Sequence, residues 1–521
     1  MSPSRFLVIG AGSRGYAYAG AITDETEGII AAVAEPIPYK RTEFGRDFIW
    51  GADGAPQEGQ SFPDWNAFLT YETARRAAAS AGDSVPPGVD GVLICVLDEM
   101  HREVIMALAP LGLHTLCEKP LVTTLKDCLD IHRALKPSAL FSVGHVLRYS
   151  PHNMLLRRLL LSDRAIGDIV SIEHTEPVGW WHFAHSYVRG NWRREATTAP
   201  SLLTKSCHDV DLLLWLLAAP YKSGSAHPFH VPVSVSSTGA LTTYRKARKP
   251  TAAGNATNCM TCPLADDGCK FSAKKIYLGP ELASLETGNR SWPVKIVLPE
   301  IEDMPDLAQA KEALATKLGE DYSAATPDRE VAARPWFGRC VYESDNDVCD
   351  DQFVTLTWDD EPSIEGAPPR FAKQATLHMV ATTKKICERY SHIYGTNGEI
   401  FADSRTITVE DFSTGQRTVY NPKMELSGHG GGDMGLARQF VLAVQGVKNE
   451  GMEVRTAQDE FIGCSLGEAI MSHLVVFAAE EARREGKVVK LGEWWDRVSK
   501  GELQSEGHEG IKWENVTGRR S

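Results

Sequence analysis

The chain has 521 residues, 43% of them hydrophobic, and a formal net charge of −13 at neutral pH. This length allows at least two domains with large cores, and the negative charge argues against a nucleic-acid partner. No apolar run approaches the roughly 18 residues of a membrane span. The first residues lack the layout of a secretory signal, and 11 mostly scattered cysteines suit a reducing compartment. We expect a cytoplasmic protein without a membrane partner.

A glycine-rich turn follows the first predicted strand. Residues 5–9 form a short apolar run that enters the turn, and residues 16–21 begin a helix behind it. A second apolar run at 29–34 ends in an acidic residue about 20 residues after the turn, as dinucleotide-binding turns require. Backbone N–H groups of such a turn approach a pyrophosphate at the helix N-terminus. We predict cofactor-binding roles for Gly10, Gly12, Ser13, Arg14, Gly15 and Glu35.

Glu35 sets the expected choice of dinucleotide. Its carboxylate can accept hydrogen bonds from a ribose 2′-hydroxyl and would repel a 2′-phosphate, so we expect NAD rather than NADP. Arg41 is able to pair with a phosphate, which keeps NADP as the less favoured alternative. A turn that needs glycine only for its own geometry is the alternative to a cofactor site.

Two further predicted strands end at the sheet edge where α/β proteins bind ligands. Residues 91–97 form a buried strand, and His101 follows it; a later strand leads into Glu118-Lys119-Pro120. Pro120 disfavours helical geometry at Lys119 and so constrains that residue locally. Another helix and a strand ending near His145 complete an alternating β/α pattern.

The turn at 10–15, the Ala34-Glu35-Pro36 strand end, the strand ending near His101 and the Glu118-Lys119-Pro120 turn together resemble the Gfo/Idh/MocA oxidoreductases. The resemblance implies an α/β plus α+β fold class. An N-terminal Rossmann NAD(P)-binding domain precedes a C-terminal domain with an open, mostly antiparallel β-sheet. It also places Lys119 in the active site near the nicotinamide, whereas a solvated surface lysine is the alternative. We group His101 and Glu118 with the cofactor-binding residues.

We divide the chain into a Rossmann domain at 1–147, a substrate and oligomerisation domain at 148–490 and a tail at 491–521. The second domain carries an expected insertion at about 245–335, where hydrophobic patterning is weak. Its predicted strands cover 169–175, 353–358, 375–383, 393–401, 406–410 and 416–420. Two helices follow, one at 433–447 and one opened by Thr456-x-x-Asp459 and stopped near Gly486. The tail, with Trp494 and Trp495, is expected to dock on the domain.

The insertion contains Cys259-x2-Cys262-x6-Cys269, a spacing typical of zinc ligands. Longer members of the family that the chain resembles carry a similar cysteine cluster and a stretch like the one at 339–347. Cys340 is therefore the candidate fourth ligand. Three reduced thiols in a loop are the alternative to a structural zinc. We do not expect a catalytic zinc, because an all-thiolate site leaves no open position.

A segment at 179–193 is dense in side chains that recognise sugars. Trp faces stack on pyranose rings, while His and Arg bind hydroxyls or a carboxylate. The alternative is a surface loop with structural aromatic residues. Asp433, after a glycine run at 430–432, is expected at the same pocket unless it only caps a helix. The candidate substrate-binding residues are Trp181, His182, His185, Arg189, Trp192, Arg193 and Asp433.

If residues 204–217 are helical, Lys205, His208 and Asp211 share one face and Cys207 points elsewhere. A Cys207–His208 nucleophilic pair or zinc site is disfavoured, because adjacent helical side chains do not face each other. The resemblance implies that His208 and Asp211 face the nicotinamide, with His208 as the base and Lys119 polarising the oxygen. Relatives often carry an aspartate at the position of Thr204. Here Lys205 instead adds a cation expected to lower the pKa of Lys119 or to bind an anionic group.

These residues together predict an NAD-dependent dehydrogenase that oxidises a secondary hydroxyl of a sugar, glycoside, polyol or sugar acid. An NAD-assisted glycosidase or lyase, working through transient C3 oxidation and elimination, is the first alternative. A non-catalytic cofactor-binding regulator is the second. The resemblance further implies a homo-oligomer formed through the open sheet.

Overall fold

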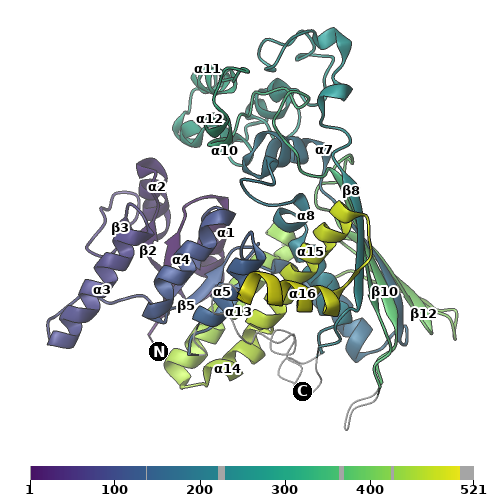
Figure 1. The fold of residues 1–521 in the computed structure, drawn as a ribbon. Coiled ribbons are helices and arrows are strands. Elements are labelled where there is room, and N and C mark those ends of the chain that lie inside the picture. The colour runs from purple at the N-terminus through teal and green to yellow at the C-terminus, as the bar shows by residue number, and fades with distance from the viewer. Residues whose placement is uncertain (1, 136–137, 221–228, 363–368, 424–427, 505–521) are drawn as a thin grey trace.

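Two β-sheets organise the computed structural model, which describes residues 2–135, 138–220, 229–362, 369–423 and 428–504 (Figure 1). The first sheet has the strand order β3-β2-β1-β4-β5-β6, and the second has the order β14-β13-β12-β11-β7-β10-β9-β8-β15. Figure 1 shows the two sheets at opposite sides of the molecule with helices between them.

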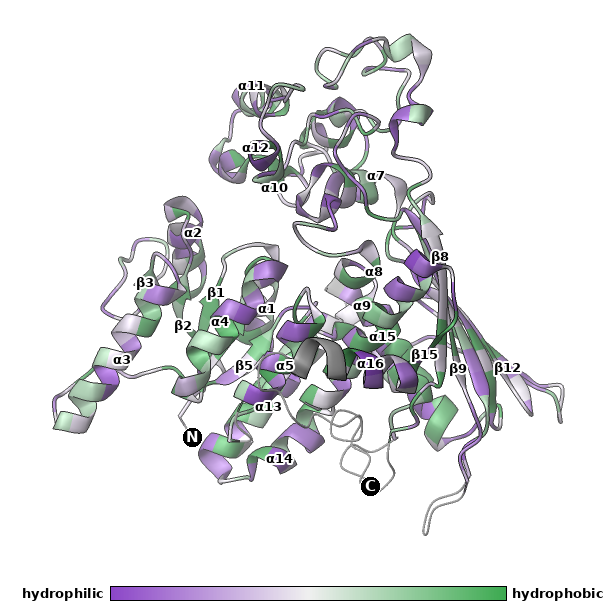
Figure 2. Cartoon of the chain, in the orientation of Figure 1, coloured by the Kyte–Doolittle hydropathy of each residue, from purple (hydrophilic) through white to green (hydrophobic). Residues whose placement is uncertain are grey.

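The first sheet is parallel throughout and confirms the predicted Rossmann fold. Its central strands are apolar and buried on both faces, as parallel sheets covered by helices require, and Figure 2 shows this hydrophobic layer. The strand order reverses between β1 and β4, which is where such sheets bind ligands. The strands are β1 (Arg5–Ile9), β2 (Ile29–Ala34), β3 (Ser61–Phe62), β4 (Gly91–Ile94), β5 (His114–Cys117) and β6 (Phe141–Val143). The helices are α1 (Ser13–Glu25), α2 (Pro38–Phe48), α3 (Trp65–Ala81), α4 (His101–Leu108) and α5 (Leu125–Ala134).

The second sheet is antiparallel except where β7 pairs with β10, which confirms the predicted mostly antiparallel sheet. Alternate residues point to opposite faces, so Val354, Leu356 and Trp358 lie on the face that helices cover. The hairpin expected at 393–401, with its turn at 395–398, is confirmed as two antiparallel strands. The strands are β7 (Ile169–Pro177), β8 (Ser234–Ala240), β9 (Asp351–Trp358), β10 (Lys373–Val380), β11 (Tyr390–Gly395), β12 (Gly398–Ala402), β13 (Ile407–Asp411), β14 (Arg417–Tyr420) and β15 (Val489–Lys490).

Helices from the end of the chain return to the first sheet. α13 (Gly432–Glu450) packs on α1. The ring of Phe440 in α13 also lies 5.8 Å from the ring of Phe6 in β1. α15 (Leu466–Glu485) packs on both α5 and β8 and so joins the two sheets. The tail helix α16 (Leu491–Gln504) buries Trp494 and Trp495, as expected of a docked extension. The rest of the predicted tail, 505–521, lies outside the described residues.

The prediction of a helix start at Thr456 is wrong. Thr456 lies in the short helix α14 (Val454–Ala457), and the chain then turns at Gly463, whose φ is +61°. α15 begins after Ser465, whose hydroxyl accepts from the Glu468 N–H while the Glu468 carboxylate accepts from the Ser465 N–H. This reciprocal capping box, rather than the earlier threonine, starts the long helix.

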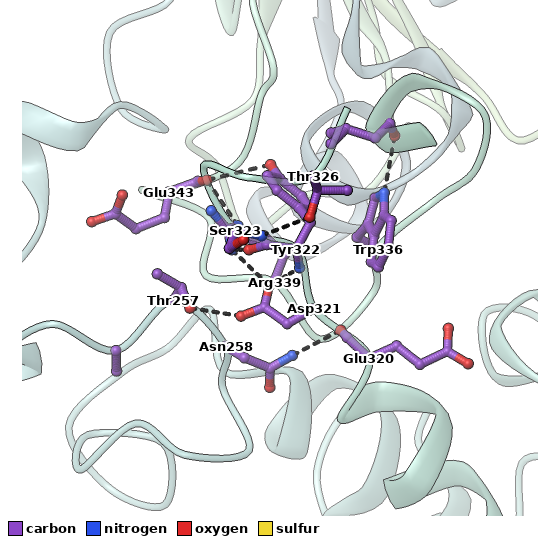
Figure 3. Close-up of polar contacts among 12 residues, drawn as sticks. Thr257, Asn258, Glu320, Asp321, Tyr322, Ser323, Thr326, Trp336, Arg339 and Glu343 are labelled. Carbon is purple, nitrogen blue, oxygen red and sulfur yellow. Dashed lines mark hydrogen bonds and ion pairs between the residues drawn. The ribbon is translucent and has the colours of Figure 1, made fainter. Parts of the chain in front are cut away.

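The expected insertion forms a unit with its own core, separate from the core that joins the two sheets. Its helices are α10 (Val294–Val297), α11 (Leu307–Leu318) and α12 (Asp328–Ala332). Arg339 anchors its end: the guanidinium donates to Asp321 at 2.6 Å and to the carbonyl of Tyr322 at 2.7 Å (Figure 3). Lys295 places its ammonium 4.9 Å from the ring of Tyr16 in α1, so the insertion reaches the Rossmann domain.

The remaining helices connect the sheets near the site. They are α6 (Pro151–Arg157), α7 (Trp180–Phe183), α8 (Ser201–Thr204) and α9 (Cys207–Leu217). In the described part of the chain, no single helix has the length and apolar character to span a membrane, although the bent pair 454–462 and 466–485 passes that test jointly.

Candidate active site

The glycine-rich turn leaves room where a pyrophosphate would bind. Gly10 has a φ of +96°, and a Cβ there would lie 2.5 Å from the carbonyl oxygen of Cys95. Gly15 is equally constrained, since its Cβ would collide with the carbonyl oxygen of Gly10. Gly12 differs, because a Cβ there would enter open space, and the adjacent Ser13 hydroxyl is buried without a hydrogen-bond partner among the described residues. These features fit a dinucleotide at the start of α1.

Glu35 folds back towards this turn from the end of β2. Its carboxylate accepts hydrogen bonds from the N–H groups of Ala11 at 2.9 Å and Ile37 at 3.0 Å. The Arg41 guanidinium donates to the carbonyl oxygen of Glu35. The arginine expected as a phosphate-binding alternative is thus already engaged by the backbone.

A buried charge network joins the turn to the second half of the chain. Arg14 donates to Glu118 at 2.8 Å and to Asp433 at 2.7 Å, and Tyr18 also donates to Glu118 at 2.6 Å. His429 lies 3.2 Å from Asp433. Burial alone would raise the pKa of Asp433, but hydrogen bonding by His429 and the charge of Arg14 hold it well below its usual range. The carboxylate expected to bind substrate is therefore already paired.

Lys119 projects from the end of β5 towards the second domain. Its Nζ donates to the carbonyl oxygen of Thr204 at 2.8 Å, at the end of α8. His101, grouped with the cofactor residues from the sequence, is fully buried, and its Nδ1 lies 2.8 Å from the carbonyl oxygen of Pro120. His101 thus supports the loop that carries Lys119.

The expected helix at 204–217 is broken. α8 ends at Thr204 and α9 starts at Cys207, with Ser206 between them outside helical geometry. His208 therefore lies in the first turn of α9, where it is 2% exposed. Cys207 is fully buried, and burial raises the pKa of its thiol to about 12, so it does not supply a nucleophile near neutral pH.

The charged partners of His208 are Asp209 and Arg389. Arg389, just before β11, places Nη2 2.5 Å from the His208 Nε2 and Nε 2.5 Å from an oxygen of Asp209. His174 on β7 lies 3.2 Å from the same carboxylate. Burial lowers the pKa of His208 well below its ordinary value. The positive charge of Arg389 lowers this pKa further, and the negative charge of Asp209 opposes the shift. His208 is neutral at neutral pH.

Two expectations for this helix need correction. Asp211, expected to face the nicotinamide, is already paired: Arg148 donates to both of its oxygens, at 2.7 and 2.8 Å. Lys205 is not a free cation, because its Nζ lies 3.0 Å from Glu176 and 3.0 Å from the Cys387 sulfur. Burial alone would lower the pKa of Lys205, but its interactions with Cys387 and Glu176 raise it.

The aromatic segment at 179–193 divides between the site and the insertion core. His182 lies 3.7 Å from the Cys387 sulfur, and Trp192 donates to Asp98 at 2.8 Å, so both belong to the site. Trp181 packs against Trp292, with ring centres 5.2 Å apart. The other three expected sugar-binding residues have partners inside the insertion: His185 with Tyr277, Arg189 with backbone carbonyls, and Arg193 with Asp345.

The four cysteines of the expected zinc site line one pocket, but the zinc is not supported. Among the described residues, no group of three or more His, Cys, Asp or Glu side chains is arranged to hold a metal ion. The backbone N–H groups of Cys259 and Cys340 each donate to a carbonyl of the other segment, and these two hydrogen bonds bring the distant segments together. The Cys259 sulfur already accepts a hydrogen bond from Arg189 at 3.3 Å.

Sequence reasoning missed Asp209, Arg389, Glu176 and Asp98. Asp209 was visible as the acidic neighbour of His208, and Asp98 as the residue after a predicted strand. Arg389 and Glu176 lie far from His208 in the sequence, and only the pairing of β7 with β11 brings them to it.

A parallel Rossmann sheet with an open glycine-rich turn, and with Lys119 at its carboxyl edge, defines a dinucleotide-binding domain. Residues 4–145 match the family model described as "Oxidoreductase family, NAD-binding Rossmann fold". Over these residues the chain is similar to the NAD-binding domain of the Gfo/Idh/MocA oxidoreductases.

Relatives of known activity match mainly this domain. Inositol 2-dehydrogenase 2 of Saccharopolyspora erythraea is 31% identical over 142 residues, which cover 27% of this chain and 38% of that protein. The 2,7-anhydro-N-acetylneuraminate hydratase of Escherichia coli is 28% identical over 130 residues, covering 25% and 34% respectively. The part of this chain that matches thus spans little more than a third of the length of these relatives.

A solved structure shares the whole fold. Levoglucosan dehydrogenase in complex with NADH and levoglucosan superposes with a TM-score of 0.57 and covers 94% of this chain and 99% of its own. Its sequence identity is 14%, so the similarity establishes the arrangement of both sheets and nothing more specific.

Proposed function

We propose that the protein is an NAD-dependent dehydrogenase that oxidises a secondary hydroxyl of a sugar, glycoside or polyol. The observation that carries this proposal is the meeting of Lys119 and His208 at the carboxyl edge of the Rossmann sheet. The Lys119 Nζ donates at 2.8 Å to a carbonyl four residues before His208, and its charge contributes to the low pKa of that histidine.

The open space at Gly12 and the unpartnered Ser13 hydroxyl support binding of the pyrophosphate. Glu35 favours NAD, because a carboxylate at the end of β2 repels a 2′-phosphate and Arg41 is already engaged. The bound nicotinamide would supply the hydride acceptor. The chain itself must bind the sugar, exclude water and move the hydroxyl proton.

Charge pairing around the site narrows the substrate class. Glu176 pairs with both Lys205, at 3.0 Å, and Arg389, at 2.9 Å, and Asp209 supplies a second negative charge to Arg389. Neither cation is therefore free to bind a substrate carboxylate, and we favour a neutral sugar over a sugar acid. His182 and Trp192, at the site margin, would bind hydroxyls and a pyranose face.

The alternative of an NAD-assisted glycosidase or lyase draws support from the hydratase relative. Transient oxidation at C3 acidifies the neighbouring C–H, which a base then removes during elimination. His182 is a candidate for this base, because burial lowers its pKa well below the ordinary value and keeps it neutral. In this reaction NADH would not accumulate.

A single assay separates these functions. Purified protein is incubated with NAD and a panel of neutral sugars, glycosides and sugar acids while NADH absorbance and released aglycone are both followed. NADH formation supports the dehydrogenase, and aglycone without NADH supports the alternative. NAD binding with neither product favours a regulator. Full turnover by both Lys119→Ala and His208→Ala would contradict the catalytic assignment.

We also propose that a second copy covers the outer face of the second sheet. β-Sheet register places Phe353, His378, His392 and Phe401 on this face, opposite the side packed by α9 and α15. Phe353 is 43% exposed and Phe401 44% exposed. None of the described helices covers this side (Figure 1), and exposed aromatic residues on one face are typical of an interface.

A further inference from the structure

The contact between Arg389 and His208 determines which imidazole nitrogen is free. A guanidinium has only N–H donors and no acceptor. At 2.5 Å from Arg389 Nη2, the His208 Nε2 must therefore offer its lone pair. In the neutral ring the single proton then lies on Nδ1.

The Nδ1 atom has no partner in the described chain and is fully enclosed. His208 itself is 2% exposed, so water does not satisfy this group at the protein surface. Buried donors in folded proteins are almost always paired. A buried N–H without a partner in the described chain, in the first turn of α9 and close to the end of α8 that Lys119 contacts, points to a ligand acceptor.

We propose, building on the dehydrogenase function, that Arg389 is a positioning residue that fixes His208 as a hydrogen-bond donor through Nδ1. The His208 N–H then binds the substrate oxygen and stabilises the negative charge that develops on it. With NAD bound, the carbon that bears this oxygen would lose its hydride to the nicotinamide and become a carbonyl carbon, the hydroxyl proton would pass to solvent, and the Lys119 Nζ would polarise the same oxygen. His208 is then a donor rather than the base expected from the sequence.

The surroundings of Arg389 hold it in this position. Its Nε lies 2.9 Å from Glu176 and 2.5 Å from Asp209, and His174 supports the same aspartate. The other charged or titratable groups facing His208 are Lys119 and His429, whose ring lies 6.0 Å away. Asp209 is the competing acceptor, because its second oxygen lies 3.3 Å from Nε2.

Removing the guanidinium would therefore release Nε2 to donate to Asp209 and move the lone pair to Nδ1. The imidazolium would also gain stability beside an Asp209 that has lost its cation. For Arg389→Met we expect kcat to fall about 100-fold, the effect typical of one lost oxyanion donor. We expect KM to change less than threefold. Added guanidinium should partly restore activity.

The direct test is the tautomer in the wild-type protein without substrate. Protein labelled with 15N-histidine is compared with His208→Gln to assign the His208 signals by long-range 15N–1H correlation. A protonated Nδ1 is expected, and a protonated Nε2 would overturn the inference. This readout needs no turnover, so an inactive protein with a protonated Nδ1 would refute the dehydrogenase proposal alone.

Arg148→Met is the matched control, since it removes an equally buried arginine that pairs with Asp211 rather than His208. It should lower stability without changing the His208 tautomer. Arg389→Lys keeps a donor and should retain the Nδ1 proton if Arg389→Met fails to fold. An unchanged kcat in a folded Arg389→Met variant would contradict the proposed role.

Discussion

Gly10 and Gly12 belong to the same turn but are constrained differently. Gly10 has a φ of +96° and lies against the Cys95 carbonyl, whereas Gly12 faces open space with a φ of −89°. Gly10→Ala should therefore cost about 2 kcal/mol or more of folding stability through backbone strain and collision. Gly12→Ala should fold normally but weaken NAD binding about tenfold, or about 1.4 kcal/mol, because the methyl group occupies the cradle.

Thermal unfolding and NADH fluorescence titration of the two variants would check this pair. Equal losses of stability, or undiminished NADH affinity in Gly12→Ala, would show that the open space at Gly12 is not the pyrophosphate site.

Asp98 makes stability depend on pH. Burial raises its pKa to about 6, with His101 and Lys119 opposing the shift, whereas an unfolded aspartate titrates near about 3.9. The folded state thus holds the proton more tightly, so this contribution is complete below about pH 4 and declines as pH rises to about 6. Asp98→Asn should be about 2 kcal/mol more stable than wild type at pH 7.5 and nearly equal at pH 4. The asparagine oxygen can still accept from Trp192.

Urea unfolding at both pH values measures the effect. Asp130→Asn is the control of opposite sign: burial alone would raise the pKa of Asp130, but hydrogen bonds from Arg102 and Lys126 lower it. Its replacement should cost stability at pH 7.5. A destabilised Asp98→Asn at that pH would contradict the assignment.

The positions of single residues could be predicted from the sequence only where nearby residues mark the end of a strand, a turn or the start of a helix. Gly10, Glu35 and Lys119 could be located because strand, turn and helix signals lie within a few residues of each one. The break at 205–206 separates Lys205 from the helix that carries both His208 and Asp211, and Asp211 is paired with Arg148 while the adjacent Asp209 lies beside His208. Arg389 could not be found, because its approach depends on the pairing of strands more than 200 residues apart.

At the scale of elements, helix starts can be tested directly. Ser465→Ala removes the capping hydroxyl of α15 and should destabilise the protein by about 1 kcal/mol. Thr456→Ala is the matched control, because Thr456 is exposed within α14 and makes no cap. Denaturant unfolding should separate the two variants. A larger loss for Thr456→Ala would restore the helix start expected from the sequence.

The long helix shows why element boundaries were harder to predict than element types. Both Thr456-x-x-Asp459 and Ser465-x-x-Glu468 satisfy the local capping pattern. The left-handed turn at Gly463, which lets α15 pack across α5 and β8, decides between them. The insertion was likewise unreadable by periodicity, since short helices and loops build its core from distant segments.

At the scale of the whole molecule, the two sheets carry different functions. The Rossmann edge presents the glycine turn and Lys119, while the inner face of the second sheet presents Glu176 and His174 beneath α9. The Arg14–Asp433 pair and the Trp192–Asp98 hydrogen bond tie these halves together around the site. The active site thus depends on domain docking, and the outer sheet face is left for other contacts.

Phe353→Asp tests whether that face joins two copies. The Phe353 ring stacks on His378 at 3.8 Å and is 43% exposed at the centre of the face. A buried, unpaired carboxylate at a dimer interface is strongly unfavourable, so the variant should become monomeric with its unfolding temperature little changed in the isolated subunit. Phe412→Asp is the control, because Phe412 is 61% exposed beyond the end of β13 rather than on the central strands. Light scattering after size-exclusion chromatography would show the masses, and a wild-type monomer at micromolar concentration would refute the interface.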